Sequence, residues 1–224
     1  MLSNPLIATA LFALLFLSLL VSIEYAYKRW ELAPEVSRKV AHVLATLFSL
    51  TLILFIQNHL FVLILGVGFF ILLYTGRKYG LLQSIDSVER HTKGSYLLPL
   101  SIYLHFFLAR WAGNTLYYVL PILVLAISDP LAALAGTKYA HRTRPIHMMG
   151  RVLDKTRIGS LAFFVSTLLL CAVTLWGYGY PMRALLILSL VIATFVTFVE
   201  MMSTGGWDNL TIPLGVFTVL WYLN

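Results

Sequence analysis

The chain has 224 residues, of which 60% are hydrophobic and only 11% are charged, and its formal net charge is +7. A soluble domain contains about 25% charged residues, so too little polar surface remains here to cover a water-soluble globule. The composition excludes a soluble domain beside the apolar segments, and we attribute the basic charge to membrane topology rather than to nucleic-acid binding. The single cysteine, Cys171, lies inside an apolar run and can form neither an intramolecular disulfide nor a cysteine metal site.

Eight apolar segments follow one another along the chain, and a helix of about 20 such residues spans a bilayer. They cover about 5–23, 36–56, 60–74, 94–109, 116–139, 159–175, 183–202 and 210–223. The first has no basic residue ahead of it and no small-residue cleavage site after it, which predicts a retained span rather than a removed signal peptide. The last is short, and a re-entrant segment is its alternative. We therefore predict an all-α polytopic membrane protein with seven to eight transmembrane helices, and a single domain over residues 1–224.

The basic residues fall in alternate gaps between these segments. Fourteen of the 16 Lys and Arg residues lie in the first, third and fifth gaps or at the segment ends beside them, and only Arg110 and Arg183 lie elsewhere. Short cytoplasmic loops retain Lys and Arg, so these gaps are predicted to face the cytoplasm, with both termini outside. The predicted cytoplasmic loops cover about 24–37, 75–93, 140–158 and 203–209. This predicts a protein integral to the cytoplasmic membrane, or to an ER or organelle membrane in a eukaryote, with its polar motifs on the cytoplasmic side.

Asp129 lies within the predicted segment 116–139, roughly 10 Å from its cytoplasmic end at about 1.5 Å per residue. A carboxylate at that depth is unfavourable unless it is paired, metal-bound or facing a wet cavity, and by default it marks a functional site. The alternative is a structural ion pair with a buried arginine. Ser128, Ala132 and Gly136 recur at four-residue spacing on the same segment, which predicts close packing against another helix.

A second motif leads into the segment 159–175. Gly159 and Ser160 are predicted to begin this helix, where free backbone N–H groups and the helix dipole favour a phosphate. Lys155 and Arg157 add positive charge for an anionic ligand. The alternative is a basic membrane flank with an ordinary serine cap.

Two further basic clusters lie nearer the N-terminus. Arg38 and Lys39 share a helix face with His42, which predicts phosphate binding with His42 as hydrogen-bond donor or proton carrier. The alternative is an interfacial basic anchor. Arg90 and Lys93 lie in the predicted loop 75–93, where a mixed acidic and basic cluster can hold a nucleotide or magnesium, and a solvated loop is the alternative.

Acidic and amide side chains gather near the predicted cytoplasmic end of segment 183–202. Glu200 lies about one turn inside that end, and Asp208 and Asn209 begin the last segment after a Gly-rich break. Oxygen ligands of this kind suit Mg²⁺, which keeps several waters and shares the rest of its coordination with phosphates. Simple N-capping is the alternative for Asp208 and Asn209.

Four stretches together resemble the CTP-dependent polyprenol kinase family, which includes dolichol, phytol and farnesol kinases and the CTP-using diacylglycerol kinase of yeast. They are Arg38-Lys39-x-x-His42, Ser128-Asp129-Pro-x-Ala-Ala-x-x-Gly136, Lys155-Thr156-x-x-Gly159-Ser160 and Asp208-Asn209-Leu-Thr-Ile-Pro213. The family has glycine where this chain has Ser128. A more distant resemblance extends to CDP-diacylglycerol synthases, but their His-Gly-Gly-x-x-Asp-Arg ending is absent here.

The resemblance implies transfer of the γ-phosphoryl group of CTP to the hydroxyl of a lipid alcohol, with Mg²⁺ as cofactor. It implies that Lys155, Thr156, Gly159 and Ser160 bind CTP. Neighbouring charge adds Arg157, Arg38, Lys39, Arg90 and Lys93 to the phosphate-binding candidates. Asp129 is the expected base or metal ligand, His42 is a second catalytic candidate, and Glu200, Asp208 and Asn209 complete the expected metal site.

Several alternatives stay open at this point. A CTP-dependent diacylglycerol kinase and a cytidylyltransferase would use a similar site on a different lipid. The competing class is a small lipid or ion transporter that uses Asp129 and Glu200 as intramembrane coupling carboxylates. Membrane lipids are the other expected partners and nucleic acid is not; the alcohol and the oligomeric state stay open.

Overall fold

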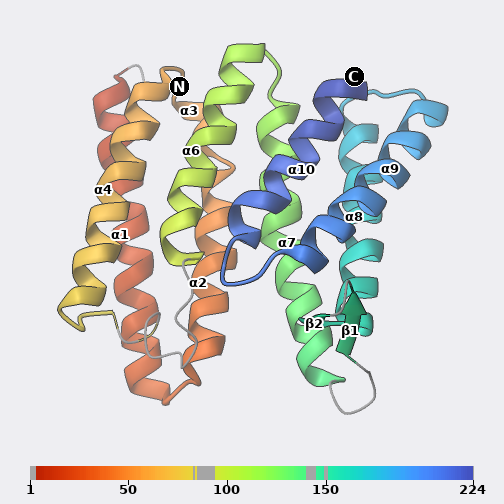
Figure 1. The fold of residues 1–224 in the computed structure, drawn as a ribbon. Coiled ribbons are helices and arrows are strands. Elements are labelled where there is room, and N and C mark those ends of the chain that lie inside the picture. The colour runs from red at the N-terminus through yellow and green to blue at the C-terminus, as the bar shows by residue number, and fades with distance from the viewer. Residues whose placement is uncertain (1–3, 83, 85–93, 140–144, 149–150, 224) are drawn as a thin grey trace. The chain divides into compact units, whose positions relative to one another are not determined.

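The computed structural model describes residues 4–82, 84, 94–139, 145–148 and 151–223. The chain divides into two compact units, unit 1 (Met1–Tyr118) and unit 2 (Val119–Asn224). Helices make up most of both units, and the only strands in the described ranges form one hairpin in unit 2 (Figure 1). The predicted all-α class is therefore confirmed.

Unit 1 is built from long antiparallel helices. It contains α1 (Pro5–Trp30), α2 (Pro34–Ser49), the short α3 (Leu52–Phe55), α4 (His59–Lys78) and α6 (Gly94–Ala112). It also contains the first residues of α7 (Leu116–Lys138). Helix α1 packs against α2 and α4, and α4 packs against α6.

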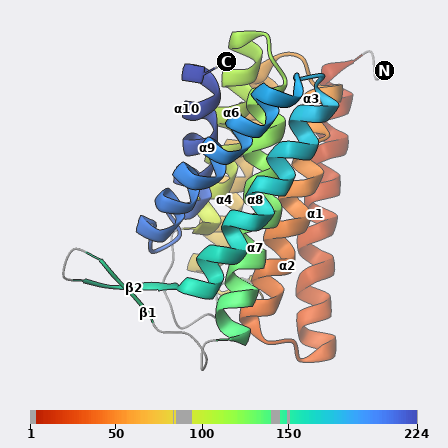
Figure 2. The ribbon, with the colours of Figure 1, turned by 90° about the vertical axis from the view of Figure 1, so that its right-hand side faces the viewer.

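Unit 2 contains the remainder of α7, followed by the hairpin and three more helices. The strands are β1 (Pro145–Met148) and β2 (Arg151–Thr156), and the helices are α8 (Arg157–Gly177), α9 (Met182–Met202) and α10 (Asp208–Leu223). Helix α9 packs against both α8 and α10. The antiparallel hairpin projects from the end of the unit at which α8 begins (Figure 2). Sequence patterning predicted a loop over 140–158 and missed these strands.

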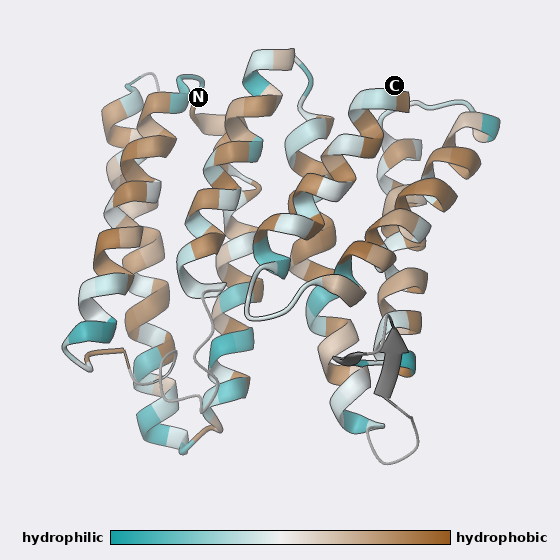
Figure 3. Cartoon of the chain, in the orientation of Figure 1, coloured by the Kyte–Doolittle hydropathy of each residue, from teal (hydrophilic) through white to brown (hydrophobic). Residues whose placement is uncertain are grey.

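All eight predicted apolar segments are helical. Among the described residues, six helices are long and apolar enough to cross a membrane: α1, α2 with α3, α4, α7, α8 and α9. Helix α10 has 16 residues, or about 24 Å at 1.5 Å per residue, which is shorter than the roughly 30 Å hydrocarbon core. In both units hydrophobic residues dominate the middle turns of the helices, and hydrophilic residues are concentrated near helix ends (Figure 3). A polytopic membrane protein is compatible with this pattern, while the full count of eight spans stays a prediction.

The predicted continuous segment 36–56 is interrupted after Ser49. Interrupting a helix inside a membrane leaves backbone carbonyls that need other donors. Two side chains supply them: the Tyr118 hydroxyl donates to the Ser49 carbonyl at 2.6 Å, and Arg110 donates to the Ile53 and Ile56 carbonyls, each at 2.6 Å. These long-range bonds explain why an uninterrupted apolar run is not one helix.

Candidate functional site

Thr156 joins strand β2 directly to helix α8. Its backbone is extended, with φ −111° and ψ 150°, and its Oγ1 accepts a hydrogen bond from the Gly159 N–H at 3.1 Å. This is an N-cap, which satisfies one of the donors at the start of a helix. The helix therefore begins at Arg157, two residues earlier than predicted, and its cap is Thr156 rather than a serine.

Helices α7 and α8 approach each other closely beside this cap. A Cβ atom on Gly159 would lie 3.0 Å from the Ala132 carbonyl oxygen and 3.0 Å from Thr156 Oγ1, and the Gly136 Cα would be 3.5 Å away. A Cβ atom on Gly136 would lie 2.9 Å from Thr156 Oγ1. The predicted small-residue ridge is thus a helix-packing surface at Ala132 and Gly136. This contact brings the helix that carries Asp129 against the β2–α8 junction.

We expect Gly159→Ala to lower the apparent unfolding temperature by about 5 °C. Overpacking a tight contact lowers the free energy of unfolding by about 1–3 kcal/mol. In a chain of this size, each kcal/mol lowers the unfolding temperature by about 2–4 °C. Gly177→Ala is the matched control at the other end of α8, where an added Cβ would meet nothing within 4 Å. Thermal unfolding of both detergent-solubilised variants checks the prediction. Equal unfolding temperatures would contradict the close crossing.

Lys155 is the centre of an ion-pair cluster. Its ammonium lies 2.8 Å from Glu200 Oε1 and 3.6 Å from Asp208 Oδ2. The second carboxylate oxygen of Glu200, Oε2, accepts a hydrogen bond from the Ser160 hydroxyl at 3.2 Å. The Glu200 side chain is only 2% exposed, whereas those of Lys155 and Asp208 are about one-fifth exposed. One buried carboxylate is therefore held from two sides by residues of the β2–α8 junction.

The charges around Lys155 determine its protonation. Burial alone would lower the pKa of the Lys155 ammonium, but the negative charges of Glu200, Asp129 and Asp208 together raise it above its ordinary value. Lys155 is therefore a fixed cation. With one positive and three negative groups, the cluster has a formal charge of −2, so it repels a free triphosphate and attracts cations.

The remaining predicted residues of this motif set lie close to the cluster in unit 2. Arg157 is exposed on the first turn of α8. The Asn209 backbone N–H donates to Asp208 Oδ1 at 3.1 Å at the start of α10, and the Asn209 side chain is buried. The third and fourth motifs of the sequence, and the charge of Asp129 from the second, are thus brought together around one ammonium.

The first motif belongs to unit 1. Arg38 donates to Glu35 through Nε at 3.2 Å and Nη2 at 2.8 Å, and Lys39 lies 3.5 Å from the same carboxylate. His42 is half-buried one turn further along α2, and its carbonyl accepts from the Thr46 hydroxyl. All three residues lie on α2, and their phosphate-binding role stays a prediction. Arg90 and Lys93 lie outside the described residues.

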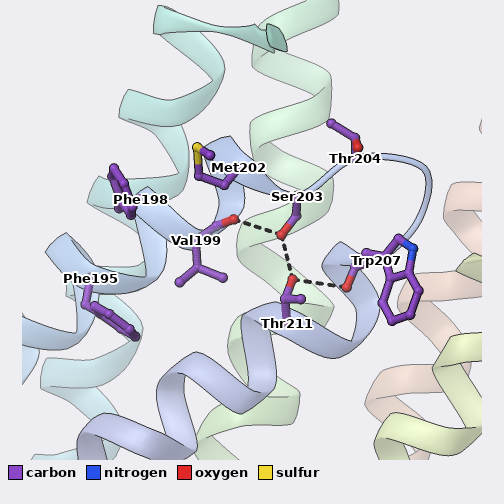
Figure 4. A pocket seen from close by; sticks show the side chains of 8 residues that line it. All are labelled: Phe195, Phe198, Val199, Met202, Ser203, Thr204, Trp207 and Thr211. Carbon is purple, nitrogen blue, oxygen red and sulfur yellow. Dashed lines mark hydrogen bonds between the residues drawn. The ribbon is translucent and has the colours of Figure 1, made fainter. Parts of the chain in front are cut away.

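Sequence patterning missed an apolar pocket at the α9–α10 junction. The pocket has a volume of about 430 Å³ and lies between the last turns of α9 and the first turns of α10 (Figure 4). The connecting turn contains Gly205 and Gly206 with φ of 65° and 90°, a backbone conformation that only glycine adopts readily. The signal available in the sequence was this glycine pair beside the recurring Phe195, Phe198 and Met202.

Comparison with known proteins gives one informative match. The chain is 30% identical over 141 residues to a phytol kinase from Synechocystis sp.. The matched region covers 63% of this chain and 59% of the relative, so the chain spans about three-fifths of that enzyme's length. No family model matches the chain, and no solved structure matches it.

Proposed function

We propose that this chain is a membrane-embedded kinase that transfers the γ-phosphoryl group of a nucleotide, CTP, to the hydroxyl of an isoprenoid alcohol. The observation that carries the proposal is the similarity to a phytol kinase. The site supports it physically, because an ammonium and three carboxylates from separate elements converge beside a helix N-terminus. Phosphoryl transfer needs this kind of positioning and charge neutralisation more than it needs covalent help from the protein.

In the proposed step the alcohol oxygen attacks the γ-phosphorus, and the bond between that phosphorus and the β–γ bridging oxygen breaks. Asp129 accepts the alcohol proton, and the products are the alkyl phosphate and CDP. Lys155 fixes Glu200 and Asp208 in place through its two ion pairs. Ser160 fixes the second oxygen of Glu200, so the site is organised before the substrates bind.

Mg²⁺ is the cofactor that the proposal includes. Asp208, Asn209 and Glu200 offer the oxygen donors that Mg²⁺ takes, since Asp129 is assigned here to the alcohol proton. Over the described ranges, no three His, Cys, Asp or Glu side chains are grouped closely enough to hold a metal by themselves. In the proposal a Mg²⁺ ion would therefore take phosphate and water ligands besides these oxygens, and it would arrive with the nucleotide. Such an ion would neutralise part of the phosphate charge, which the cluster of formal charge −2 would otherwise repel.

The nucleotide-binding residues have two kinds of role in this proposal. Arg157 and the N-terminus of α8 face the phosphates, since Arg157 is exposed and the helix dipole favours an anion there. Lys155, Thr156, Gly159 and Ser160 act by building that end of α8, because each is already committed to a cap, a close contact or Glu200. Arg38, Lys39 and His42 lie in unit 1, and their phosphate-binding role, with His42 able to carry a proton, stays a prediction from the sequence.

Product analysis of purified protein in lipid nanodiscs tests the proposal. CTP and Mg²⁺ are supplied with phytol, farnesol, a polyprenol or diacylglycerol, with ATP as the comparison nucleotide. We expect CDP and a phosphorylated isoprenoid alcohol in equal amounts. Phosphorylation of diacylglycerol alone would indicate a diacylglycerol kinase, and pyrophosphate release on adding phosphatidic acid would indicate a cytidylyltransferase. Lipid or ion movement in liposomes without any nucleotide turnover would overturn the enzyme proposal in favour of a transporter.

A further inference from the structure

The pocket at the α9–α10 junction faces outward from unit 2 and is mostly apolar. Phe195, Phe198 and Met202 of α9 and Trp207 of the connecting turn line it, and these side chains are between 43% and 48% exposed. Its volume of about 430 Å³ falls within the roughly 300–1,000 Å³ range of small-molecule sites. Aromatic walls with an adaptable methionine suit a flexible hydrocarbon chain.

A pair of hydroxyls interrupts this apolar lining. Ser203 Oγ and Thr211 Oγ1 lie 2.6 Å apart, while Ser203 Oγ lies 2.8 Å from the Val199 carbonyl and Thr211 Oγ1 lies 3.0 Å from the Trp207 carbonyl (Figure 4). The two hydroxyls carry only two hydrogens but four lone pairs, and the contact between them can use at most one lone pair. The pair therefore keeps acceptor capacity inside the pocket, which an entering O–H group can use.

This hydroxyl pair lies next to the Lys155 cluster in the chain. Ser203 follows Glu200 by three residues, and Thr211 follows Asp208 by three residues. Residues three apart on a helical turn have Cβ atoms about 5–6 Å from each other. The pocket and the carboxylate cluster are thus built from neighbouring residues of the same two helix ends.

We propose that this pocket binds the hydrocarbon chain of the isoprenoid alcohol beside its hydroxyl, with the Ser203 and Thr211 pair accepting the alcohol O–H in the complex without nucleotide, before the proton passes to Asp129 during transfer. The inference rests on the proposed function and names where its lipid substrate binds. Charge favours this occupant over a bulk phospholipid, because a cluster of formal charge −2 lies one turn away and repels an anionic phosphate head group. A neutral hydroxyl brings no such repulsion and can donate its hydrogen to a free lone pair of Ser203 or Thr211.

Photo-crosslinking without nucleotide tests the site independently of turnover. A farnesol analogue with a diazirine in its chain is irradiated with the protein in nanodiscs, and the labelled peptides are mapped by mass spectrometry. We expect adducts on the α9–α10 junction that excess phytol displaces and excess phosphatidylglycerol does not. Adducts elsewhere in a protein that still phosphorylates alcohols would overturn the pocket and leave the proposed kinase intact. Displacement by phosphatidylglycerol as well would show a bulk-lipid groove and also overturn the pocket.

Two pairs of variants sharpen the test. Met202→Trp fills the pocket, and Met182→Trp makes the same change at the other end of α9, where the side chain is 65% exposed. Thr211→Val removes one acceptor, and Thr218→Val is its control, because both threonines lie on α10 and contact the carbonyl of the residue four positions earlier in the chain.

We expect Met202→Trp to reduce labelling and raise the alcohol KM about tenfold, and Thr211→Val to raise that KM about three- to tenfold, as loss of one hydrogen bond does. The nucleotide KM and both controls should stay unchanged. Unchanged labelling and alcohol KM in both pocket variants would contradict the proposal. If no alcohol is phosphorylated by the unsubstituted protein, the proposed function fails, and phytol-displaceable labelling would still support an alcohol-binding pocket.

Discussion

Replacing Lys155 by methionine should abolish phosphoryl transfer and lower the apparent unfolding temperature by about 10 °C. The ammonium of Lys155 is within 2.8 Å of Glu200, a carboxylate whose side chain is only 2% exposed. Removing one partner of a buried ion pair leaves an uncompensated charge and lowers the free energy of unfolding by about 3–5 kcal/mol. In a chain of this size, each kcal/mol lost lowers the unfolding temperature by about 2–4 °C. The same change frees Asp208, so the carboxylates lose their common anchor.

The double variant Lys155→Met with Glu200→Gln provides the control. Removing both charges eliminates the unpaired carboxylate, so most of the thermal stability should return while activity stays lost. Lys155→Arg keeps the charge and should unfold near the temperature of the unsubstituted protein. A Lys155→Met variant with normal stability and only a raised nucleotide KM would contradict the anchoring role. That result would instead favour direct contact between Lys155 and the nucleotide.

Asp129→Asn should reduce turnover by about 10²–10⁴-fold, the range that a positioned general base contributes. The amide has nearly the same shape as the carboxyl group, but it cannot accept the alcohol proton. Because the pairing of Lys155 with Glu200 and Asp208 remains, the unfolding temperature should change by less than about 4 °C. Turnover in nanodiscs and thermal unfolding in detergent measure the two effects separately.

Two comparisons make the Asp129 result specific. Glu31→Gln removes an exposed carboxylate that ends α1 in unit 1, and it should leave turnover unchanged. Nucleotide binding by Asp129→Asn, measured by titration calorimetry without alcohol, should be retained, since the residue is proposed to act on the alcohol proton. Turnover near that of the unsubstituted protein would remove Asp129 from the chemistry.

The helices of this protein could be predicted from local sequence. The segments predicted at about 116–139 and 183–202 are the helices Leu116–Lys138 and Met182–Met202. An apolar segment of this length satisfies its own backbone hydrogen bonds as a helix, so its extent depends little on the rest of the fold. The small-residue spacing at Ala132 and Gly136 likewise predicted a packing surface, because four-residue spacing places side chains on one helix face.

The interrupted helix after Ser49 and the hairpin β1–β2 could not be predicted in this way. The first depends on donors from Tyr118 and Arg110, which lie more than fifty residues away in the chain. The second occupies a basic stretch whose composition indicated only a cytoplasmic loop. Local composition does not encode which distant donor or strand will be available.

The candidate site shows the same division. Periodicity, hydropathy and spacing within single segments were enough to predict the helical class, the extent of the apolar helices and the residue types that could carry chemistry. The pairing of Lys155 with Glu200 and Asp208, the contact of Ser160 with a carboxylate forty residues away and the apolar pocket beside them depend on how the helices pack. A charge buried among packed helices takes its partner from whichever element packs beside it. Close contacts between helices, such as that of Gly136 with Gly159, determine which elements pack together. The spacing of residues within one helix predicts a packing face but not the helix that packs against it.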